Sequence, residues 1–488
     1  MPMTFESVIG LEIHSQLLTD TKIFCRCRTT FGAAPNTQVC PVCLGLPGAL
    51  PVLNARAVEF AVRAALALGC TVQPTSVFAR KNYFYPDLPK GYQISQFEQP
   101  LAVDGLLTYE SDGQTSTVRI IRVHLEEDAG KSLHDEVPES EAVTSLDFNR
   151  SGVPLIEIVT YPDLRTAVAA ADFFARLRAI LQAVGVNDGN MEEGSLRCDA
   201  NISIRPVGST ELGVKVEIKN INSFRYLERA IDYEYDRQVR VVGDGGVVVQ
   251  ETRLWDTVRG RTVSMRSKEE AHDYRYFPEP DLPPLKVARE WVEELRQGLP
   301  ELPEQRKQRF ITEYGLSEYD ARLLTESTEV STYFEETARA SGLPKAASNW
   351  VKGEVLRRVK EESVELERLK VQPPALAALI ALIDTGRVSG LAAKRIFERM
   401  SETGESEEVV VAAEGLTQID DGDTLSAAVQ NVIDAQTDAV ESYRSGKIGT
   451  LGFLVGQVMR ETQGKANPKR VNELLRQQLD SMGANPKA

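Results

Sequence analysis

The chain has 488 residues, of which 42% are hydrophobic and 26% are charged, a globular composition with enough length for about two to four domains. The sequence holds no apolar run of about 18 residues, which excludes a membrane-spanning helix, and its first residues lack the pattern of a signal or transit peptide. We therefore expect a cytoplasmic protein. The formal net charge of −15 argues against nucleic-acid binding by the chain as a whole, since phosphate contacts need Lys and Arg.

Residues 1–294 predict an α+β domain built on a large mixed sheet. Hydrophobic and polar residues alternate over short segments, which is the pattern of half-buried strands. These segments are 8–17, 118–125, 155–159, 201–205, 214–219 and 246–252. Two helices are predicted between them. One follows the N-cap residue Asn54, and the other runs from Thr166 to Val184 and ends at Gly185.

Helical periodicity replaces the strand pattern soon after Pro283-Pro284, and we expect an all-α region from there onward. We divide it into a helical domain over 295–405 and a small α-helical tail over 406–488. Residues 401–440 contain ten acidic residues and no Lys or Arg, whereas 441–488 contain eight Lys or Arg and four acids. Such a basic end is either a footprint for a polyanion or a solvated helical face.

Four cysteines are spaced as CxC-x12-CxxC: Cys25, Cys27, Cys40 and Cys43. Disulfides are rare in the cytoplasm, and four thiols within 19 residues suit a tetrahedral structural zinc site. The alternative is a set of reduced thiols without a metal. A site with four protein ligands has no open position, so we interpret it as structural rather than catalytic. Cys70 and Cys198 are expected to be ordinary buried thiols.

Polar residues alternate with apolar ones in the first predicted strand. Because side chains of a strand alternate in direction, Glu12, His14 and Gln16 share one face. The other face is expected to be core: Ile9, Leu11 and Ile13. An acid and an imidazole about 6.5 Å apart along a strand can reach one cation. The alternative is an exposed polar face without a ligand.

Three consecutive acids, Glu126, Glu127 and Asp128, follow another predicted strand, and Glu157 interrupts an apolar strand. Adjacent carboxylates repel each other unless a cation lies between them, and Mg²⁺ favours carboxylates together with water and substrate phosphates. A lone Glu in an apolar strand is costly to bury unpaired. Glu157 is therefore either a ligand or one half of a buried salt bridge.

Two further patterns carry polar or aromatic groups. Alternate residues of 199–205 form a polar face, which either binds a sugar, base or phosphate or is a solvated sheet edge. Residues 80–87 and 272–279 combine cations with aromatic rings, as in sites for nucleotides or RNA ends, although packed aromatics are an equal alternative. The sequence has no GxxxxGK[ST] motif and no GxGxxG after a predicted strand, so any ATP site is of another type.

The chain resembles the GatB family, the B subunits of glutamyl/aspartyl-tRNA amidotransferases. The resemblance covers nearly the whole chain and includes the spacing of the four cysteines. It rests on these blocks, in this order: VIGLEIHSQL, LPGALPVLN, RKNYFYPDLPKGYQISQ, HLEEDAGKS, DFNRSGVPLIEIV, EEGSLRCDANIS, EIKNINSF, DYRYFPEPDLPPL and GFLVGQVMRETQGKANPKRVNELL. The family implies a cradle-shaped first domain, a helical domain and a tail that resembles the small YqeY proteins.

The resemblance also implies a function and partners. A member of this family is a ligase that uses ATP and Mg²⁺ to phosphorylate the side-chain carboxylate of Glu-tRNA(Gln) or Asp-tRNA(Asn). Ammonia from the amidase subunit, GatA, then gives Gln-tRNA(Gln) or Asn-tRNA(Asn), and a small subunit, GatC, completes the complex. The family's Mg²⁺ ligands match Glu12, His14, Glu127 and Glu157, with Glu126 adjacent, and its Zn²⁺ clamp matches the four cysteines. The basic tail would contact tRNA.

Two other hypotheses remain open from the sequence. The chain could be a non-catalytic zinc protein that binds RNA, in which case its acids serve only structure and no metal-dependent ATPase activity is expected. It could also be a free-standing ligase that acts on small acids, which would be indifferent to tRNA.

Overall fold

The computed structural model describes residues 4–133, 144–266, 274–362, 364–415, 422–462 and 465–482. The chain divides into two compact units, Met1–Pro303 and Glu304–Ala488. Within the described residues, no helix is both long and apolar enough to cross a membrane. The expected α+β class is confirmed, because strands occur in the first unit and the described part of the second unit is helical.

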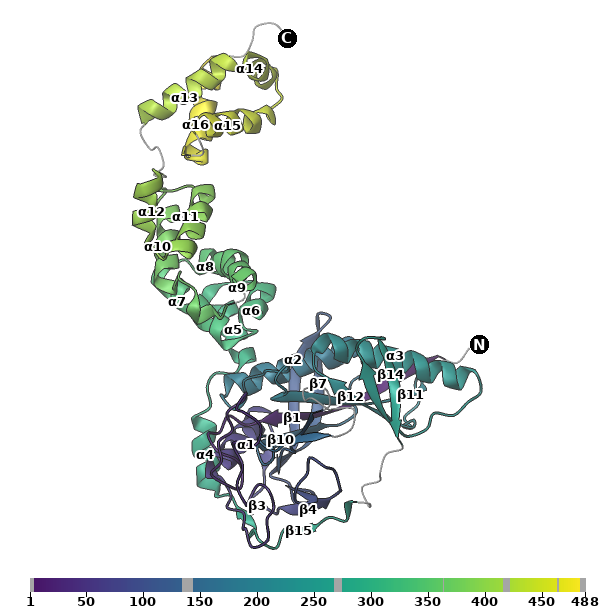
Figure 1. Cartoon of the computed structure of the whole chain (residues 1–488). Coiled ribbons are helices and arrows are strands. Elements are labelled where there is room, and N and C mark those ends of the chain that lie inside the picture. Colours follow the sequence, from purple (N-terminus) through teal and green to yellow (C-terminus); the bar gives the residue numbers. More distant parts are fainter. Residues whose placement is uncertain are drawn as a thin grey trace. The chain divides into compact units, whose positions relative to one another are not determined.

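A nine-stranded mixed sheet forms the body of the first unit (Figure 1). Its strand order is β14-β13-β12-β11-β1-β10-β7-β6-β2, and β12 and β13 are its parallel pair. Its strands are β1 (Phe5–Gln16), β2 (Thr71–Val72), β6 (Ala102–Ser111), β7 (Gln114–Glu127), β10 (Pro154–Thr160), β11 (Leu196–Pro206), β12 (Val216–Ile221), β13 (Thr252–Asp256) and β14 (Arg261–Arg266).

Three small sheets lie beside the large one. Their strand orders are β15-β4-β5, β16-β3 and β8-β9. The strands are β3 (Thr75–Ser76), β4 (Ala79–Asn82), β5 (Tyr92–Ser95), β8 (Lys131–Leu133), β9 (Ser145–Asp147), β15 (Phe277–Pro278) and β16 (Leu285–Lys286). The three-stranded sheet matters most for the site, because it joins a segment near residue 80 to one near residue 277.

Helices cover one face of the large sheet: α1 (Ala55–Ala67), α2 (Ala167–Ala183) and α3 (Phe224–Gly243). In Figure 1, α2 and α3 lie side by side along it. The predicted N-cap Asn54 is confirmed, since its side chain accepts a hydrogen bond from the first turn of α1. Thr166, the predicted start of the second helix, is the N-cap of α2 and accepts a hydrogen bond in the same way. The inward residues of β1 are buried against these helices, as expected: Ile9, Leu11 and Ile13. The opposite face of β1 is therefore available for polar side chains.

One predicted strand is wrong in its position. Residues 246–251 form no strand, and β13 begins at Thr252. Val247 and Val249 are exposed, at 79% and 69%, while Val248 between them is 8% exposed. The valine-rich pattern therefore predicted a strand where, among the described residues, no neighbouring strand pairs with this segment.

The helices of the second unit form two separate cores. One includes residues from Phe310 to Val411 and the other residues from Leu425 to Leu479. Helix α12, which we expected in the tail, therefore packs with the helical domain. The helices from residue 289 onward are α4 (Arg289–Gln297), α5 (Pro303–Tyr314), α6 (Glu318–Leu324), α7 (Thr328–Ser341), α8 (Pro344–Trp350), the π-helix η2 (Val351–Val355), α9 (Leu356–Glu362), the 3-10 helix η3 (Leu366–Arg368), α10 (Pro373–Asp384), α11 (Gly390–Thr403), α12 (Glu407–Glu414), α13 (Gly422–Ala435), α14 (Thr437–Arg444), α15 (Thr450–Glu461) and α16 (Pro468–Ser481).

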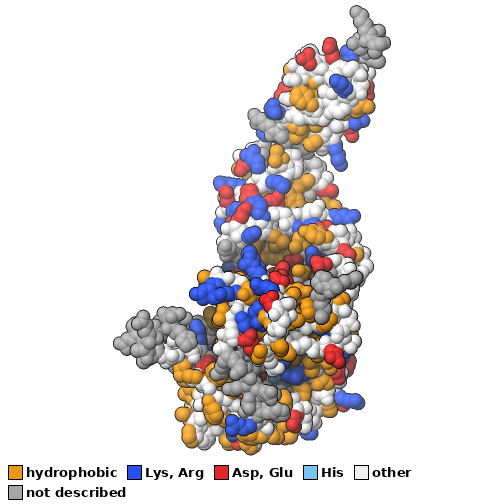
Figure 2. All heavy atoms as spheres, turned by 90° about the vertical axis from the view of Figure 1, so that its right-hand side faces the viewer, with side chains coloured by type: hydrophobic (Ala, Val, Ile, Leu, Met, Phe, Trp, Pro, Cys, Tyr) orange, Lys and Arg blue, Asp and Glu red, His pale blue; other side chains and the backbone are white. Residues whose placement is uncertain are grey.

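Charged side chains of both signs mix on the surface of the helical domain. Figure 2 shows basic and acidic groups beside one another there. Arg357 pairs with Glu361 within one helix, and Arg387, in the connection between α10 and α11, pairs with Glu408 of α12. Such a surface is that of solvated amphipathic helices.

A buried ion pair fixes the three-stranded sheet. Arg80 of β4 donates to both carboxylate oxygens of Glu279 at 2.7 and 2.8 Å, and the Glu279 side chain is 0% exposed. Arg80→Met leaves that carboxylate buried without its partner, so we expect the free energy of unfolding to fall by about 3–5 kcal/mol in urea denaturation. Arg119→Met is the matched control, because Arg119 makes the same two-point contact with Asp163 but is 59% exposed. A loss in the control as large as in Arg80→Met would contradict this ranking.

Candidate functional site

A row of ionisable residues crosses three neighbouring strands of the large sheet. The antiparallel register sets His14 of β1 opposite Glu157 of β10, and Glu157 opposite His124 of β7. Directly paired residues point to the same face of a sheet. Glu126 lies two residues after His124 and therefore joins this face. The site thus follows from strand pairing between segments far apart in the sequence.

The side chains of this row lie close together. The Nε2 atom of His14 is 3.8 Å from Oε1 of Glu126 and 3.9 Å from Oε2 of Glu157. One ligand atom from each of these three residues lies within 4.8 Å of the other two. An imidazole and two carboxylates at such distances fit the coordination sphere of one divalent cation.

His124 and Ser95 contact the carboxylates of the row and hold them in one orientation. Nε2 of His124 lies 3.2 Å from Oε2 of Glu157 and 3.7 Å from Oε2 of Glu126. The hydroxyl of Ser95 donates to the same oxygen of Glu126 at 3.1 Å. His124 and both glutamates are buried. Partners of this kind hold metal-binding carboxylates in one orientation.

Both carboxylates are held in the ionised form. Burial by itself raises the pKa of Glu157, but attraction to the His124 imidazole holds that pKa well below its usual range. Burial and the neighbouring charge of Glu157 also raise the pKa of Glu126, yet His124 and Lys81 lower it overall. Two buried anions that stay charged attract a cation, which agrees with a metal site.

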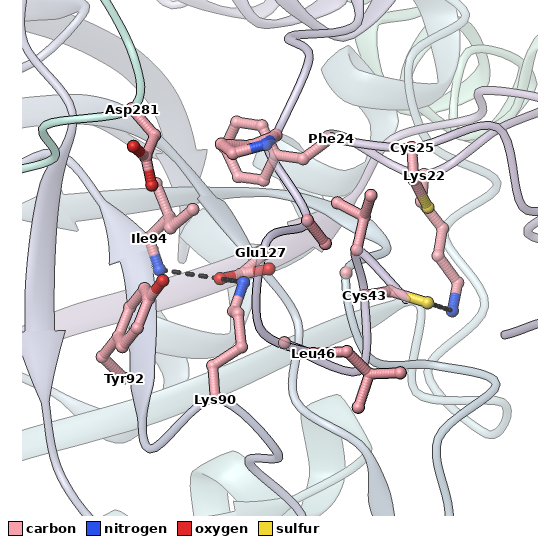
Figure 3. A pocket seen from close by; sticks show the side chains of 15 residues that line it. Lys22, Phe24, Cys25, Cys43, Leu46, Lys90, Tyr92, Ile94, Glu127 and Asp281 are labelled. Atoms are coloured by element: carbon pink, nitrogen blue, oxygen red, sulfur yellow. Dashed lines mark hydrogen bonds and ion pairs between the residues drawn. The ribbon is translucent and has the colours of Figure 1, made fainter. Parts of the chain in front are cut away.

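The structure separates Glu127 from this row. Consecutive strand residues point to opposite faces, so Glu127 faces away from Glu126. Its Oε1 atom accepts a hydrogen bond from the Ile94 amide at 2.8 Å and forms an ion pair with Lys90 (Figure 3). It borders a cavity of about 100 Å³ that also touches the cysteine loop.

Glu12 lies on the same face of β1 as His14, as predicted, but its carboxylate is hydrogen-bonded to β11, the strand on the side of β1 away from β10. Its Oε1 atom accepts a hydrogen bond from Asn201 Nδ2 at 2.9 Å, and Asn201 belongs to β11. The ligand set that the resemblance implies is therefore divided in this structure. His14 and Glu157 lie together with Glu126, while Glu12 and Glu127 are held by other groups.

A larger cavity opens beside the row. It has a volume of about 590 Å³, which is within the range of sites for small ligands. Polar and basic groups line it, among them Arg150, Arg197 and Asn149. Arg197 is the cross-strand neighbour of His14, so the cavity adjoins the row. Asp199, from the predicted polar face of 199–205, also lines it.

Asp128 holds the cations of this cavity in place. It accepts hydrogen bonds from Arg197 at 3.1 Å and from Gln16 at 2.7 Å, and Arg150 lies 3.8 Å away. Burial raises the pKa of Asp128, but the two guanidinium groups lower it below its ordinary value. A buried acid thus fixes two basic side chains at the cavity wall.

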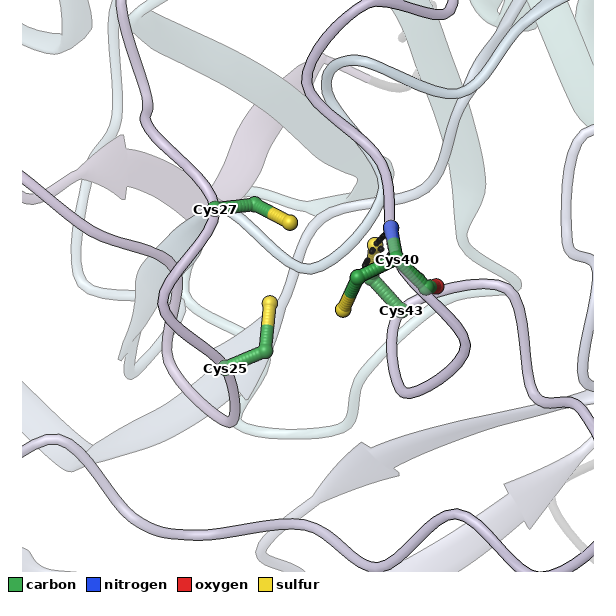
Figure 4. Close-up of side chains that lie close together, drawn as sticks. All are labelled: Cys25, Cys27, Cys40 and Cys43. Atoms are coloured by element: carbon green, nitrogen blue, oxygen red, sulfur yellow. Dashed lines mark hydrogen bonds between the residues drawn. The ribbon is translucent and has the colours of Figure 1, made fainter.

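The four predicted cysteines come together. Figure 4 shows the side chains of Cys25 and Cys27 facing those of Cys40 and Cys43, and their sulfurs all lie within 4.8 Å of one another. A tetrahedral Zn²⁺ site with Zn–S bonds of about 2.3 Å requires sulfurs about 3.8 Å apart. The Cys40 and Cys43 sulfurs are 3.9 Å apart, so this pair has the spacing of a zinc site.

The electrostatics of the cysteine group favour a thiolate at Cys43, whereas the hydrogen bond with Cys43 raises the pKa of Cys25 and burial raises the pKa of Cys27 to about 11. The hydrogen bond from Cys25 is the main cause that lowers the pKa of Cys43, to about 4, and the ammonium of Lys22 contributes. Lys22 is buried, and its Nζ lies 3.6 Å from the Cys43 sulfur. The other two cysteines, Cys70 and Cys198, are buried outside this group, as expected. The donor set fits a closed tetrathiolate site.

Lys81 is a residue whose place near the row the sequence did not indicate. It belongs to β4, and its Nζ lies 5.1 Å from the ring centre of Tyr274 and 5.8 Å from that of Tyr83. Burial lowers the pKa of this ammonium, but Glu126 and Glu157 raise it above its usual value. Of the predicted aromatic segments, His272 and Asp273 lie outside the described residues.

His124 was missed as well, although a signal for it exists. It lies two residues before Glu126 in a predicted strand, so the same alternation that united Glu12 with His14 places these two on one face. Lys81 has no such local signal, because its approach to the row depends on how the small sheet sits against the large one.

Comparison with known proteins identifies the parts of the chain. Residues 7–293 match the family model described as the GatB/GatE catalytic domain, and residues 332–479 match the model described as the GatB domain. The chain is 54% identical over 473 residues to the B subunit of the aspartyl/glutamyl-tRNA(Asn/Gln) amidotransferase of Thermodesulfovibrio yellowstonii, covering 97% of this chain and 99% of the relative. It is 53% identical to the protein of the same name from Carboxydothermus hydrogenoformans, with the same coverage. For the protein of that name from Chlorobium phaeobacteroides the identity is 54%, covering 98% and 100%.

Asp128→Asn tests the anchor of the large cavity. The native pKa of Asp128 is below its unfolded value of about 3.9, so its contribution to stability is present above that pH and is lost as the pH falls through the native pKa. We expect the variant to unfold more easily at pH 7 by about 1–3 kcal/mol. In urea titrations, the difference from the unchanged protein should persist down to about pH 5 and narrow below about pH 3.9. A difference that does not depend on pH would contradict the role of the charge.

Proposed function

Because this chain belongs to the GatB family, we propose that it activates the side-chain carboxylate of glutamate or aspartate attached to tRNA, as the B subunit of an aspartyl/glutamyl-tRNA amidotransferase. The family matches extend over nearly the whole chain. The observation that carries the chemistry is the group of His14, Glu126 and Glu157, which can hold one cation beside a polar cavity. The reaction is that of a carbon–nitrogen ligase with glutamine as amido donor.

The chemistry follows from the weakness of a carboxylate as an electrophile. Attack by ammonia on a carboxylate would have to expel oxide, which is a very poor leaving group. Transfer of the γ-phosphoryl group of ATP to a carboxylate oxygen gives an acyl phosphate and ADP. Ammonia then attacks the carbonyl carbon, and phosphate leaves with the electron pair. The products are Gln-tRNA(Gln) or Asn-tRNA(Asn), ADP and phosphate.

His14, Glu126 and Glu157 are the residues that we assign to the Mg²⁺ site. When bound, Mg²⁺ orients the phosphates of ATP and offsets the charge that develops during phosphoryl transfer. His124 and Ser95 keep the two carboxylates turned toward His14. The other two family ligands, Glu12 and Glu127, stay outside this assignment, because Asn201 and the Lys90–Ile94 segment engage their carboxylates.

The large cavity is our candidate for the nucleotide or for the aminoacylated end of tRNA. Arg150 and Arg197 supply positive charge on its wall, and Asn149 and Asn220 supply hydrogen-bonding groups. Phosphates and riboses require groups of these kinds. The cavity and the row share one face of the sheet, so a bound phosphate chain can extend from one to the other.

We propose that the four cysteines bind Zn²⁺ as a structural clamp. We also propose that the tail contacts tRNA and that the protein works with an amidase, GatA, and a small subunit, GatC. Lys131 and the loop between the two cysteine pairs line the large cavity. Contact with the phosphates of tRNA requires exposed Lys and Arg side chains on the tail. Exposed basic residues of the tail include Lys447, Arg460, Lys469, Arg470 and Arg476.

The separation of two adjacent glutamates gives a matched test of the metal site. We expect Glu126→Gln to weaken Mn²⁺ or Mg²⁺ binding to the purified complex by more than the roughly 10- to 100-fold typical of changes outside the ligand shell. ATP hydrolysis that depends on mischarged tRNA should fall with it. Glu127→Gln makes the same replacement of a carboxylate by an amide at the next residue, whose side chain lies on the other face of the sheet. This variant should leave the metal affinity nearly unchanged. The assignment fails if Glu127→Gln weakens metal binding and Glu126→Gln does not.

The same assay separates the rival functions. A non-catalytic zinc protein that binds RNA would hydrolyse no ATP with metal and mischarged tRNA. A ligase for small acids would hydrolyse ATP equally well without tRNA.

Zinc content tests the clamp independently of activity. We expect about one zinc ion per chain in the purified protein and close to none in Cys40→Ser, since a structural zinc site requires all four ligands. Cys70→Ser, a buried cysteine outside the group, should retain the zinc. The measurement is metal analysis by atomic emission after gel filtration. Equal zinc content in both variants would show that the four sulfurs do not form the site.

A further inference from the structure

Lys22 is a lysine that is completely enclosed by the protein, with 0% of its surface exposed. Backbone contacts fix the segment around it. The Lys22 amide donates to the Cys27 carbonyl at 2.9 Å, and the Ile23 amide donates to the Gly152 carbonyl at 2.9 Å. Burying an ammonium group is costly unless a counter-charge accompanies it. The position of Lys22 therefore requires an anionic partner.

The ammonium of Lys22 has two partners. Its Nζ atom donates to the Cys43 sulfur at 3.6 Å and to the Phe148 carbonyl at 3.2 Å, and Figure 3 draws the first of these contacts. Among the described residues, no carboxylate oxygen lies within 4.0 Å of this Nζ atom. A carbonyl carries no net charge, so the counter-charge of Lys22 comes from the cysteine group.

The cysteine group has the complementary excess of charge. Four thiolates carry more negative charge than one Zn²⁺ neutralises, and excess charge is costly to bury. Cys43 is the buried member of the group, whereas Cys25, Cys27 and Cys40 are partly exposed. The sulfur of Cys43 also accepts a hydrogen bond from the Cys40 amide at 3.1 Å. Lys22 thus supplies positive charge at the one sulfur that water reaches least.

We propose that Lys22 is the counter-charge of the zinc clamp, and that its ammonium holds the Cys43 thiolate in place by an N–H···S hydrogen bond. This inference rests on the zinc site proposed above. Lys22 acts through Cys43 and is therefore a positioning residue. A hydrogen bond from such a neighbour orients a metal ligand and tunes the electron density that the ligand gives to the metal.

Zinc affinity tests this role on the full-length protein. We expect Lys22→Met to weaken zinc binding by about 10- to 100-fold, the range for loss of a group that supports a metal ligand, in competition with a chelator of known affinity. Arg26→Met is the matched control, because it removes a cation from between Cys25 and Cys27. Arg26 is exposed, so solvent already screens its charge, and the zinc affinity of this control should be nearly unchanged.

Co²⁺ in place of Zn²⁺ separates positioning from simple structural support. The sulfur-to-cobalt charge-transfer absorption depends on the electron density of the thiolates. Loss of the hydrogen bond raises the energy of the Cys43 sulfur electrons, so we expect the band of Lys22→Met to move to longer wavelength. Arg26→Met should keep the band of the unchanged protein. If Lys22 only supported the Phe148 carbonyl, its removal would lower stability without moving the band.

A second pair of variants keeps the test independent of whether Lys22→Met folds. Lys22→Arg retains the charge and the N–H donors, and the cavity of about 100 Å³ beside Lys22 gives room for a guanidinium group. Lys22→Gln retains N–H donors without the charge. We expect the Arg variant to bind zinc more tightly than the Gln variant.

The outcomes distinguish this inference from the zinc clamp itself. If Lys22→Met and Arg26→Met bind zinc equally tightly, or if Lys22→Gln binds zinc as tightly as Lys22→Arg, Lys22 is not the counter-charge and the inference is overturned. In both cases zinc bound by the unchanged protein leaves the clamp intact. If the unchanged protein contains no zinc and binds none when zinc is added, the clamp fails, and the inference fails with it.

Discussion

The pairing register of β1, β10 and β7 is the constraint on which the site depends. It places Glu157 opposite both His14 and His124. A slip of β10 by one residue would turn Glu157 into the core and bring Ile156 or Ile158 to the two imidazoles. The register is secured on the other face of the sheet, where Ile156 and Ile158 are completely buried. Hydrophobic packing on one face therefore specifies the chemistry on the other.

The electrostatics of the site follow from that register. Two carboxylates share a buried position and remain charged, because His124 and Lys81 offset their mutual repulsion and the cost of burial. These offsets differ in kind. His124 touches the carboxylates, whereas Lys81 stays beyond ion-pair distance between aromatic rings. The close contact of His124 holds the Glu157 carboxylate in one orientation.

The sequence predicted the parts of this structure that depend on local pattern. Alternation placed Glu12 and His14 on one face and identified Glu157 as an acid in an apolar strand. The cap Asn54 and the helical pattern from Thr166 to Val184 located two helices. It could not decide which of two consecutive acids faces the row, because β7 ends at Glu127 and only its pairing with β10 fixes the facing side. Valine-rich residues 246–251 misled for the same reason, since a strand needs a partner as well as a pattern.

The end of β7 lies between the row of ionisable residues and the loop that carries the cysteines. Glu126 and Glu127 are joined by one peptide bond, and the first belongs to the row with His14 while the second pairs with Lys90. Lys90 in turn packs against Gly45, which follows Cys43 in the loop that carries the cysteines. A Cβ atom added at Gly45 would collide with the Lys90 side chain. So close an approach admits only glycine without displacement of that lysine. Lys90 therefore joins the loop of the cysteines to Glu127, the chain neighbour of the Glu126 carboxylate in the row.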